Sequence, residues 1–235
     1  VFAEASKKLD EWVMKNIIIF DLDYTLTKKG TWGRFVLYTV KYKPWIWLPL
    51  ILSAGFAQWR YKAGYTPRIS VKQSMMKWSM VGHSKVKMER LADKFAKNEV
   101  LHGLRPGAIE ALNYHKSSGD IIIIASAAVD LIVKPVAELL KIDYWVATNM
   151  RWINNFLSEE FESKNCYGSE KLERVKQLLE NTLAYDRNET FIKMYTDSIS
   201  DIDILRFSDE GVAVNPDRKL AKVAIDENFE LVNWN

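Results

Sequence analysis

The sequence predicts an α/β fold built on a doubly wound parallel sheet, with an all-helical domain inserted into it. Short apolar runs rich in β-branched residues alternate with amphipathic helical patterns along most of the chain, and this alternation is typical of a parallel sheet with crossover helices. The alternation stops in residues 30–104, where four helical patterns follow one another. We therefore expect a discontinuous core of residues 14–29 and 105–235, interrupted by a helical cap of residues 30–104.

The expected strands are apolar nearly throughout, as in strands that are buried on both faces. The first one ends in Ile17-Ile-Ile-Phe20 and stops at an acidic loop. Strands are expected at residues 15–20, 121–125, 144–147, 191–195 and 211–214. Because ligands of such sheets bind at the carboxyl ends of the strands, we expect the functional residues there.

Helical patterns separate these strands and fill the insert. Pro106 suits the first turn of a helix, and Ser169 suits the start of a capped amphipathic helix. Core helices are expected at residues 106–117, 128–141, 169–183 and 217–225. Insert helices are expected at residues 32–42, 44–61, 70–81 and 84–100.

The composition is that of an ordinary globular protein, with 48% apolar and 27% charged residues among 235. Cys166 is the only cysteine, which excludes an internal disulfide and suits a reducing compartment. The first residues lack the continuous apolar segment of a secretory signal. Met14 stands just before the first strand, so residues 1–13 are interpreted as a leader of unknown role.

The charge is distributed unevenly along the chain. Residues 30–104 hold 13 Lys and Arg against three acids, a net charge of +10, whereas the whole chain has a net charge of only +3. A basic segment within an otherwise acidic protein indicates an anionic partner for that segment. A solvated helical surface is the alternative interpretation.

Four aspartates follow two of the expected strands. Asp21 and Asp23 flank a single residue after the first strand, and the alternation of side chains directs both carboxylates to one side. Asp197 and Asp201 follow the strand at 191–195 and are one helical turn apart. Like charges this close are costly unless a cation lies between them or a proton is shared. Such oxygens suit a hard divalent cation, and Mg²⁺ is the usual one beside a phosphate.

Two further polar residues stand at the ends of expected elements. Ser126 ends the isoleucine-rich strand and can donate a hydrogen bond, or it caps the following helix. Lys171 opens a helix and can bring a positive charge to a phosphoryl oxygen, although an isolated lysine there is more often solvated. Alternatively, Asp201 is an ordinary acid in the first turn of a helix, where its negative charge interacts favourably with the positive end of the helix dipole.

Taken together, these motifs resemble the haloacid dehalogenase-like phosphatase superfamily, and they occur in the order of that family over residues 16–235. The motifs are Asp21-x-Asp23-x-Thr25, Ser126, Lys171 and Asp197-Ser-x-Ser-Asp201. The helical insert directly after the first motif is similar to subclass IB, which includes phosphoserine phosphatase. Tyr24 and Thr196 depart from the pattern, because many relatives have glycine at these two positions.

The resemblance implies an Mg²⁺-dependent phosphatase that passes through an aspartyl-phosphate intermediate. It implies that Asp21 is the nucleophile and that Asp23 is the general acid and base. It also implies that Ser126, Lys171 and Thr25 hold the phosphoryl oxygens. The metal ligands that it implies are Asp21, the backbone carbonyl of Asp23, Asp197 and, directly or through water, Asp201.

The first half of the insert contains an unusual run, residues 45–57, that is apolar nearly all round. Trp45 and Trp47 begin it, and basic residues precede and follow it. Thirteen residues of helix extend roughly 20 Å, which is too short to cross a bilayer. Tryptophans with flanking bases match a segment that lies on an anionic membrane surface. A buried helix of the insert or an oligomer contact is the alternative.

The insert also resembles that of the phosphatidylglycerophosphatase C group within this subclass, including the stretch Gly82-His83-Ser84. This resemblance implies a lipid or other hydrophobic phosphomonoester, such as phosphatidylglycerophosphate. One alternative is a phosphoserine phosphatase-like hydrolase of a small soluble metabolite, and another is a membrane-associated scaffold with a vestigial site. We expect a cytoplasmic protein, peripheral to the inner face of the membrane, with no nucleic-acid partner.

Overall fold

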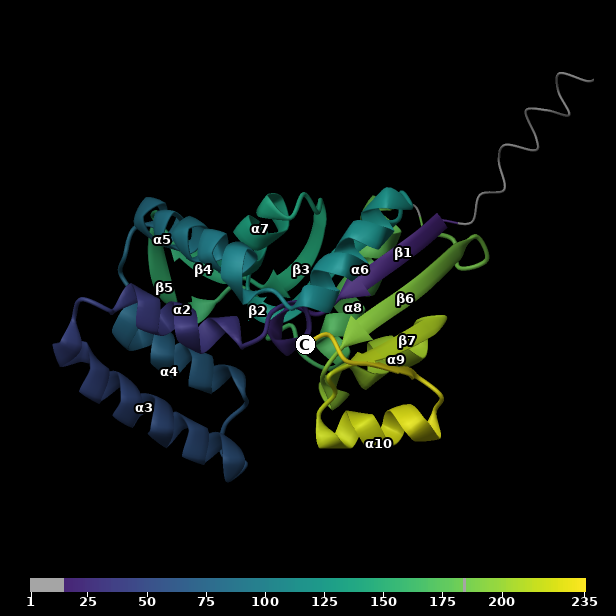
Figure 1. The fold of residues 1–235 in the computed structure, drawn as a ribbon. Coiled ribbons are helices and arrows are strands. Elements are labelled where there is room, and N and C mark those ends of the chain that lie inside the picture. Colours follow the sequence, from purple (N-terminus) through teal and green to yellow (C-terminus); the bar gives the residue numbers. More distant parts are fainter. Residues whose placement is uncertain (1–14, 184) are drawn as a thin grey trace, which may run out of the picture.

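The computed structural model describes residues 15–183 and 185–235, so the interpretation of residues 1–13 as a leader lies outside the described residues. Its main sheet is shown in Figure 1. The strands are β1 (Lys15–Phe20), β2 (Ile121–Val129), β3 (Tyr144–Thr148), β6 (Thr190–Thr196), β7 (Glu210–Val214) and β8 (Glu230–Val232). They lie in the order β3-β2-β1-β6-β7-β8, and every pair of neighbours is parallel. The predicted fold class is confirmed.

Helices cover both faces of this sheet. They are α6 (Pro106–Ser117), α7 (Asp130–Leu139), α8 (Ser169–Thr182), α9 (Ile202–Phe207) and α10 (Arg218–Asp226). Side chains alternate along β1, so Ile18 and Phe20 pack with residues of α6 and α7, whereas Ile17 and Ile19 pack with residues of α8, α9 and α10. Burial on both faces explains why the strands are apolar nearly throughout.

The helical insert consists of α2 (Thr31–Thr39), α3 (Pro44–Lys62), α4 (Ile69–Ser79) and α5 (Lys85–Asn98). All four predicted helices are present. Their own core contains Phe35, Met76, Met88 and Phe95, and it continues onto Ile132 of the core helix α7. The insert therefore packs against the carboxyl-terminal edge of the sheet through α7, while the domain limits at residues 30 and 104 stay a prediction.

A small hairpin that the sequence analysis does not contain completes the insert. Strands β4 (Met150–Ile153) and β5 (Phe156–Phe161) pair antiparallel. Asn154 and Asn155 join them with φ angles of 50° and 65°, and two residues with positive φ form a tight turn whose twist suits a hairpin. Leu157 is buried in the core of the insert, so the hairpin packs with the insert although in sequence it lies between β3 and α8 of the core.

Strand β2 extends beyond its predicted end. It continues to Val129, and α7 begins at Asp130 rather than at residue 128. The pairing of β2 with β3 shifts register between Ala125 and Val129. Ser126 therefore lies in an irregular part of a strand and not at a helix cap.

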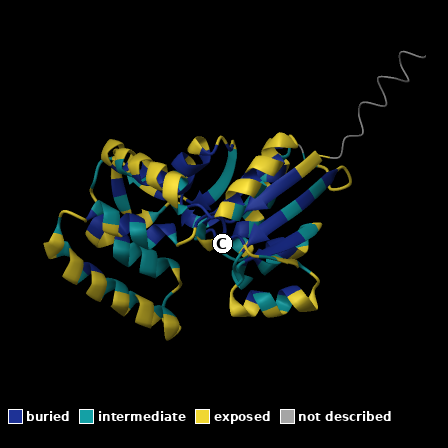
Figure 2. Cartoon of the chain, in the orientation of Figure 1, coloured by how far each residue is buried: buried dark blue, intermediate teal, exposed yellow. Residues whose placement is uncertain are grey.

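Helix α3 lies on α4 at the outer edge of the molecule (Figure 1). Among its residues, all of which are described, only Leu50 is buried. The rest of the helix is mostly exposed (Figure 2), including Trp45, Leu48 and Trp59. No helix within the described residues is long and apolar enough to cross a membrane.

Candidate active site

The carboxyl end of β1 fixes the position of Asp21. This residue follows Phe20 directly, and its amide donates a hydrogen bond of 3.0 Å to the carbonyl of Tyr195 on β6. The chain then turns through η1 (Leu22–Leu26), where Tyr24 has φ 64°. A tyrosine in the left-handed region is uncommon, and such strain is concentrated at functional sites. The Arg105 side chain stabilises the turn by donating to the carbonyl of Tyr24 at 2.9 Å.

Lys171, at the start of α8, joins two of the predicted carboxylates. Its Nζ donates to Oδ1 of Asp21 at 2.9 Å and to Oδ2 of Asp201 at 2.8 Å. All three side chains are buried. Burial alone would lower the pKa of Lys171, but the charges of Asp201 and Asp21 raise it above its usual range. The lysine therefore stays protonated and supplies a fixed positive charge beside Asp21.

Asp201 ends the short helix η3 (Ile199–Asp201) and is almost fully enclosed. Its Oδ2 also accepts a hydrogen bond of 2.7 Å from Thr196, one of the two positions that depart from the family pattern. Its Oδ1 is buried and has no hydrogen-bond partner within the described residues. An orphaned carboxylate oxygen at this depth is costly and favours a ligand, a water or an ion beside it.

Thr25 connects the first and last motifs. Its buried hydroxyl lies 3.5 Å from Oδ2 of Asp21 and 3.3 Å from Oδ1 of Asp197, and it accepts from the Asp197 amide at 3.0 Å. Burial and the nearby charge of Asp201 raise the pKa of Asp197 to about 6, although the hydrogen bond from Thr25 lowers this pKa. The two carboxylates are therefore separated by one hydroxyl group.

Asp23 is held away from this pair. Its Oδ1 accepts a hydrogen bond of 2.8 Å from the amide of Thr31, the first residue of α2. Burial raises the pKa of Asp23, while its hydrogen bond to Thr31 opposes the shift. A carboxyl group with a raised pKa keeps its proton to a higher pH than a free aspartate does, which suits a group that donates a proton during a reaction.

Ser126 approaches from the neighbouring strand β2. It is 1% exposed, and its Oγ accepts a hydrogen bond of 3.1 Å from the amide of Ala128. The hydroxyl proton is directed to no acceptor within the described residues, so it can be donated to a ligand.

The oxygen atoms assigned to Mg²⁺ fit a hard cation. Burial raises the pKa of Asp21, and the charges of Asp201 and Asp197 raise it further, whereas Lys171 lowers it. A divalent cation next to these crowded oxygens lowers such pKa values. The described residues contain no group of three or more His, Cys, Asp or Glu side chains that could hold a metal. The expected set is of another kind, because it combines the carboxylates of Asp21 and Asp197 with the carbonyl of Asp23, and Asp201 joins it directly or through water.

Lys72 of α4 is a site residue that sequence reasoning missed. Its Nζ donates to the carbonyl of Ala127, one residue after Ser126, and to Oδ1 of Asn165, at 2.5 and 2.6 Å. Burial lowers the pKa of Lys72 to about 8, although the charge of Asp23 opposes the shift. In the sequence it is one of 13 basic residues of residues 30–104, and no local pattern distinguishes it.

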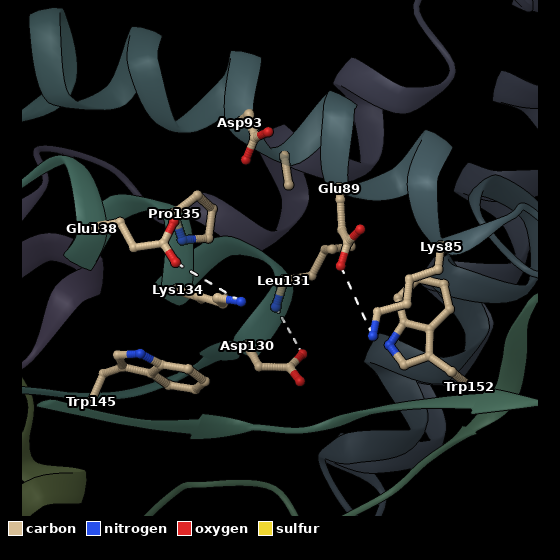
Figure 3. A pocket seen from close by; sticks show the side chains of 11 residues that line it. Lys85, Glu89, Asp93, Asp130, Leu131, Lys134, Pro135, Glu138, Trp145 and Trp152 are labelled. Atoms are coloured by element: carbon tan, nitrogen blue, oxygen red, sulfur yellow. Dashed lines mark hydrogen bonds and ion pairs between the residues drawn. The ribbon is translucent and has the colours of Figure 1, made fainter. Parts of the chain in front are cut away.

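A separate cavity of about 440 Å³ lies between α5 and α7 (Figure 3). Four of its charged side chains form two ion pairs, with Lys85 4.0 Å from Glu89 and Lys134 3.9 Å from Glu138. Asp130 accepts a hydrogen bond from the Leu131 amide. The lining contains none of the predicted site residues. This cavity is therefore distinct from the candidate active site.

One family of known proteins matches most of the chain. The model of the haloacid dehalogenase-like hydrolase family matches residues 18–206 of the chain. The matched region begins within β1 and ends within α9, so it contains every predicted site residue.

Individual relatives are distant but cover nearly the whole chain. A histidinol-phosphatase from Neisseria meningitidis serogroup C (strain 8013) is 24% identical over 229 residues, which cover 94% of this chain and 100% of the relative. A protein of unknown function from Bordetella pertussis Tohama I has a TM-score of 0.82 at 18% identity, covering 95% of this chain and 100% of its own. A phosphoserine phosphatase, solved as a phospho-aspartyl intermediate analogue, has a TM-score of 0.62 at 16% identity and 95% coverage of both chains. These structures show a shared fold.

Proposed function

Since this chain belongs to the haloacid dehalogenase-like hydrolase family and is a phosphatase, we propose that it cleaves phosphomonoesters. The proposed reaction passes through an aspartyl-phosphate intermediate and uses Mg²⁺ as cofactor. The observation that carries the proposal is the ion-paired Asp21, held at a strand end by Lys171, with the partly buried Asp23 two residues further on. The phosphoserine phosphatase with a similar fold was solved as an analogue of such an intermediate.

Asp21 is the proposed nucleophile. One carboxylate oxygen attacks phosphorus opposite the leaving oxygen, the new P–O bond forms, and the ester P–O bond breaks. Lys171 and Ser126 donate hydrogen bonds to the phosphoryl oxygens and offset their charge. The 2.9 Å contact between Lys171 and Asp21 supports this role, because the ammonium group lies beside the carboxylate that would attack phosphorus.

Asp23 is the proposed acid and base. It gives its proton to the departing alkoxide, so the product leaves as a neutral alcohol. In the second step it takes a proton from water, and the hydroxide attacks phosphorus, releases inorganic phosphate and regenerates Asp21. The raised pKa of Asp23 suits the first of these steps.

Asp21, Asp197 and the Asp23 carbonyl would hold Mg²⁺, and the bound ion would neutralise charge at the phosphoryl oxygens. Asp201 would support the metal directly or through water, and it also fixes Lys171 through their 2.8 Å contact. We propose that Thr25 assists phosphate binding and keeps Asp21 and Asp197 at their separation.

We also propose that the core and the insert have different roles. Residues 14–29 and 105–235 form the catalytic core, and residues 30–104 form a cap that selects the substrate. The contact of Lys72 with Ala127 and Asn165 supports this division, because it brings α4 of the insert to the catalytic strand ends.

The exposed face of α3 favours a hydrophobic substrate at an anionic membrane surface. Trp45, Leu48 and Trp59 are 72%, 67% and 58% exposed, which is unusual for large apolar side chains gathered on one helix. Lys41 precedes the helix, and Arg60 adds positive charge in its last turn. The soluble-metabolite alternative has the support of the relatives, one of which is a histidinol-phosphatase.

A panel of phosphomonoesters tests the proposed function. Purified protein with Mg²⁺ is expected to release inorganic phosphate from small esters and, faster, from alkyl or lipid phosphates dispersed in detergent. Release from no ester in the panel, with or without Mg²⁺, would rule the proposal out.

A further inference from the structure

The turn that carries the proposed acid is held at two points, and both contacts come from Arg105. Its Nε donates a hydrogen bond of 2.9 Å to the carbonyl of Tyr24, and its backbone amide donates one of 2.9 Å to the carbonyl of Leu26. Tyr24 stands between Asp23 and Thr25 and has φ 64°. A tyrosine keeps this conformation only where its surroundings impose it. The contact with Arg105 therefore fixes the backbone directly after Asp23.

Arg105 is a buried cation without an anionic partner. It is 8% exposed, and its side chain donates to two neutral oxygens, the carbonyl of Tyr24 and Oδ1 of Asn235. No carboxylate of the described residues forms an ion pair with it. A buried guanidinium that only neutral groups hold is costly to the fold. Stability therefore does not explain Arg105, and its place beside the turn indicates a role in the reaction.

Asn235 is itself held by the residue before it. Trp234 is 9% exposed, and its ring packs on that of Tyr195 with 5.2 Å between the centroids. Its amide donates to Oδ1 of Asn215 at 3.0 Å. A Cβ at Gly107 would lie only 2.4 Å from the indole ring, so this close approach requires glycine. The start of α6 and the loop after β7 therefore fix the segment that contains Asn235.

We propose that Arg105 is a positioning residue for proton transfer by Asp23, and that Asn235 holds its guanidinium against the turn. Asp23 is then fixed on two sides, by this backbone contact and by the hydrogen bond of its Oδ1 with the amide of Thr31. The proton of the Asp23 carboxyl goes to the oxygen released from phosphorus. This inference rests on the proposed function and adds two residues from outside the sequence motifs. Both act through the turn.

Two esters of nearly equal size separate proton transfer from the rest of the reaction. p-Nitrobenzyl phosphate releases an alcohol, whose oxygen needs a proton as it leaves, whereas p-nitrophenyl phosphate releases a phenolate that is stable without one. The quantity to measure is kcat/KM at saturating Mg²⁺. It reports the steps up to departure of the leaving group and not the later hydrolysis of the intermediate. The ratio of the two kcat/KM values therefore reports the contribution of the acid.

Asn235→Leu removes the acceptor of the Arg105 guanidinium. It should lower kcat/KM for p-nitrobenzyl phosphate about tenfold and that for p-nitrophenyl phosphate by less than about twofold. Arg105→Met should have a larger effect of the same kind. Asn235→Asp keeps an acceptor for Arg105 and should retain most of the wild-type ratio. Arg187→Met is the matched control, because Arg187 pairs with Asp209 at the opposite edge of the sheet, and it should have the wild-type ratio.

A merely structural role of Asn235 predicts a different result. A smaller folded fraction reduces both kcat/KM values by the same factor, so their ratio would not move. An active Asn235→Leu protein with the wild-type ratio would therefore overturn the inference, while the proposed function would stand.

Hydrogen exchange tests the restraint on the turn without turnover. Residues 22–27 should take up deuterium about threefold faster or more in Asn235→Leu and Arg105→Met than in the wild type. The rate in Arg187→Met should equal that of the wild type. If the wild type hydrolyses neither ester, the proposed function fails, and this comparison still decides whether Asn235 holds the turn. Equal uptake in Asn235→Leu and the wild type overturns the inference whatever the activity.

Discussion

The ammonium group of Lys72 on helix α4 donates a 2.6 Å hydrogen bond to the side chain of Asn165 in the core. The same nitrogen donates to the carbonyl of Ala127. Through these two bonds a residue from the middle of the insert reaches the strand end that carries Ser126. The insert and the catalytic strands are thereby held together at the candidate active site.

Lys72 gives the first prediction, which concerns stability and pH. Burial lowers its pKa from 10.5 to about 8. Below pH 8 both the folded and the unfolded chain carry this proton, so folding bears the full cost of burying the charge. Between pH 8 and 10.5 the unfolded chain binds more protons, and the contribution of Lys72 to the free energy of unfolding should rise, by on the order of 1–3 kcal/mol.

Denaturant unfolding of the wild type and Lys72→Met across pH 7–10.5 measures this contribution. The free energy of unfolding of the wild type, relative to that of Lys72→Met, should increase as pH rises. Lys77→Met provides the matched control, because Lys77 lies on the same helix with an exposed side chain. A difference that stays constant across the range would contradict the burial of the charge.

The second prediction concerns the nucleophile. Asp21→Asn should keep the fold and reduce kcat by at least about a thousandfold, because an amide cannot form the acyl phosphate. Phosphate release and circular dichroism measure the two properties. Asp226→Asn, an exposed change on α10, should have wild-type activity. Hydrolysis by Asp21→Asn at a rate near that of the wild type would disprove the mechanism.

The third prediction concerns the metal. Activity should disappear in EDTA and return with Mg²⁺, and Ca²⁺ should support it poorly because its larger, looser coordination misplaces the reacting groups. Mg²⁺ should also raise the melting temperature, because it binds the folded chain preferentially. Asp197→Asn should weaken both effects. Full activity after exhaustive chelation would exclude the proposed metal role.

The fourth prediction concerns helix α3. Vesicles that contain acidic lipids should bind the protein better than neutral ones, with each nearby base contributing about 1 kcal/mol and with weaker binding at high salt. Replacing Trp45 and Leu48 together by serine should reduce this binding, whereas Ile225→Ser, an equally exposed apolar position on α10, should not. Flotation of the protein with vesicles is the measurement. If the wild type does not float at low salt, the apolar face of α3 has another partner.

Much of the candidate site could be predicted because parallel strands end at a common edge. Asp21, Ser126 and Asp197 are far apart in sequence, yet each follows or lies in an apolar strand, and the sheet brings the three strands together. The contact of Lys171 with Asp21 could be predicted for the same reason, because α8 begins at that edge of the sheet. The roles of these residues in catalysis stay a prediction.

The contributions of the insert could not be predicted in this way. Whether Lys72 points to solvent or to Asn165 depends on how α4 packs on the core, and neither its neighbours nor its spacing determines that packing. The hairpin that β4 and β5 form was missed for another reason. Its strands are short and mix apolar with charged residues such as Arg151 and Glu159, and only the Asn154-Asn155 turn indicates it.

The position of β1 in the centre of the sheet also determines when the protein can fold. Ile17 pairs with Ile121 on one side and with Ile192 on the other, so β1 is synthesised well before both of the strands with which it pairs. Such distant pairing slows folding, while the insert can form local helices earlier. Until Ile192 is available, the apolar β1 lacks a neighbour and can associate with other chains. A ribosome-bound chain that ends before β6 should therefore be a substrate for chaperones.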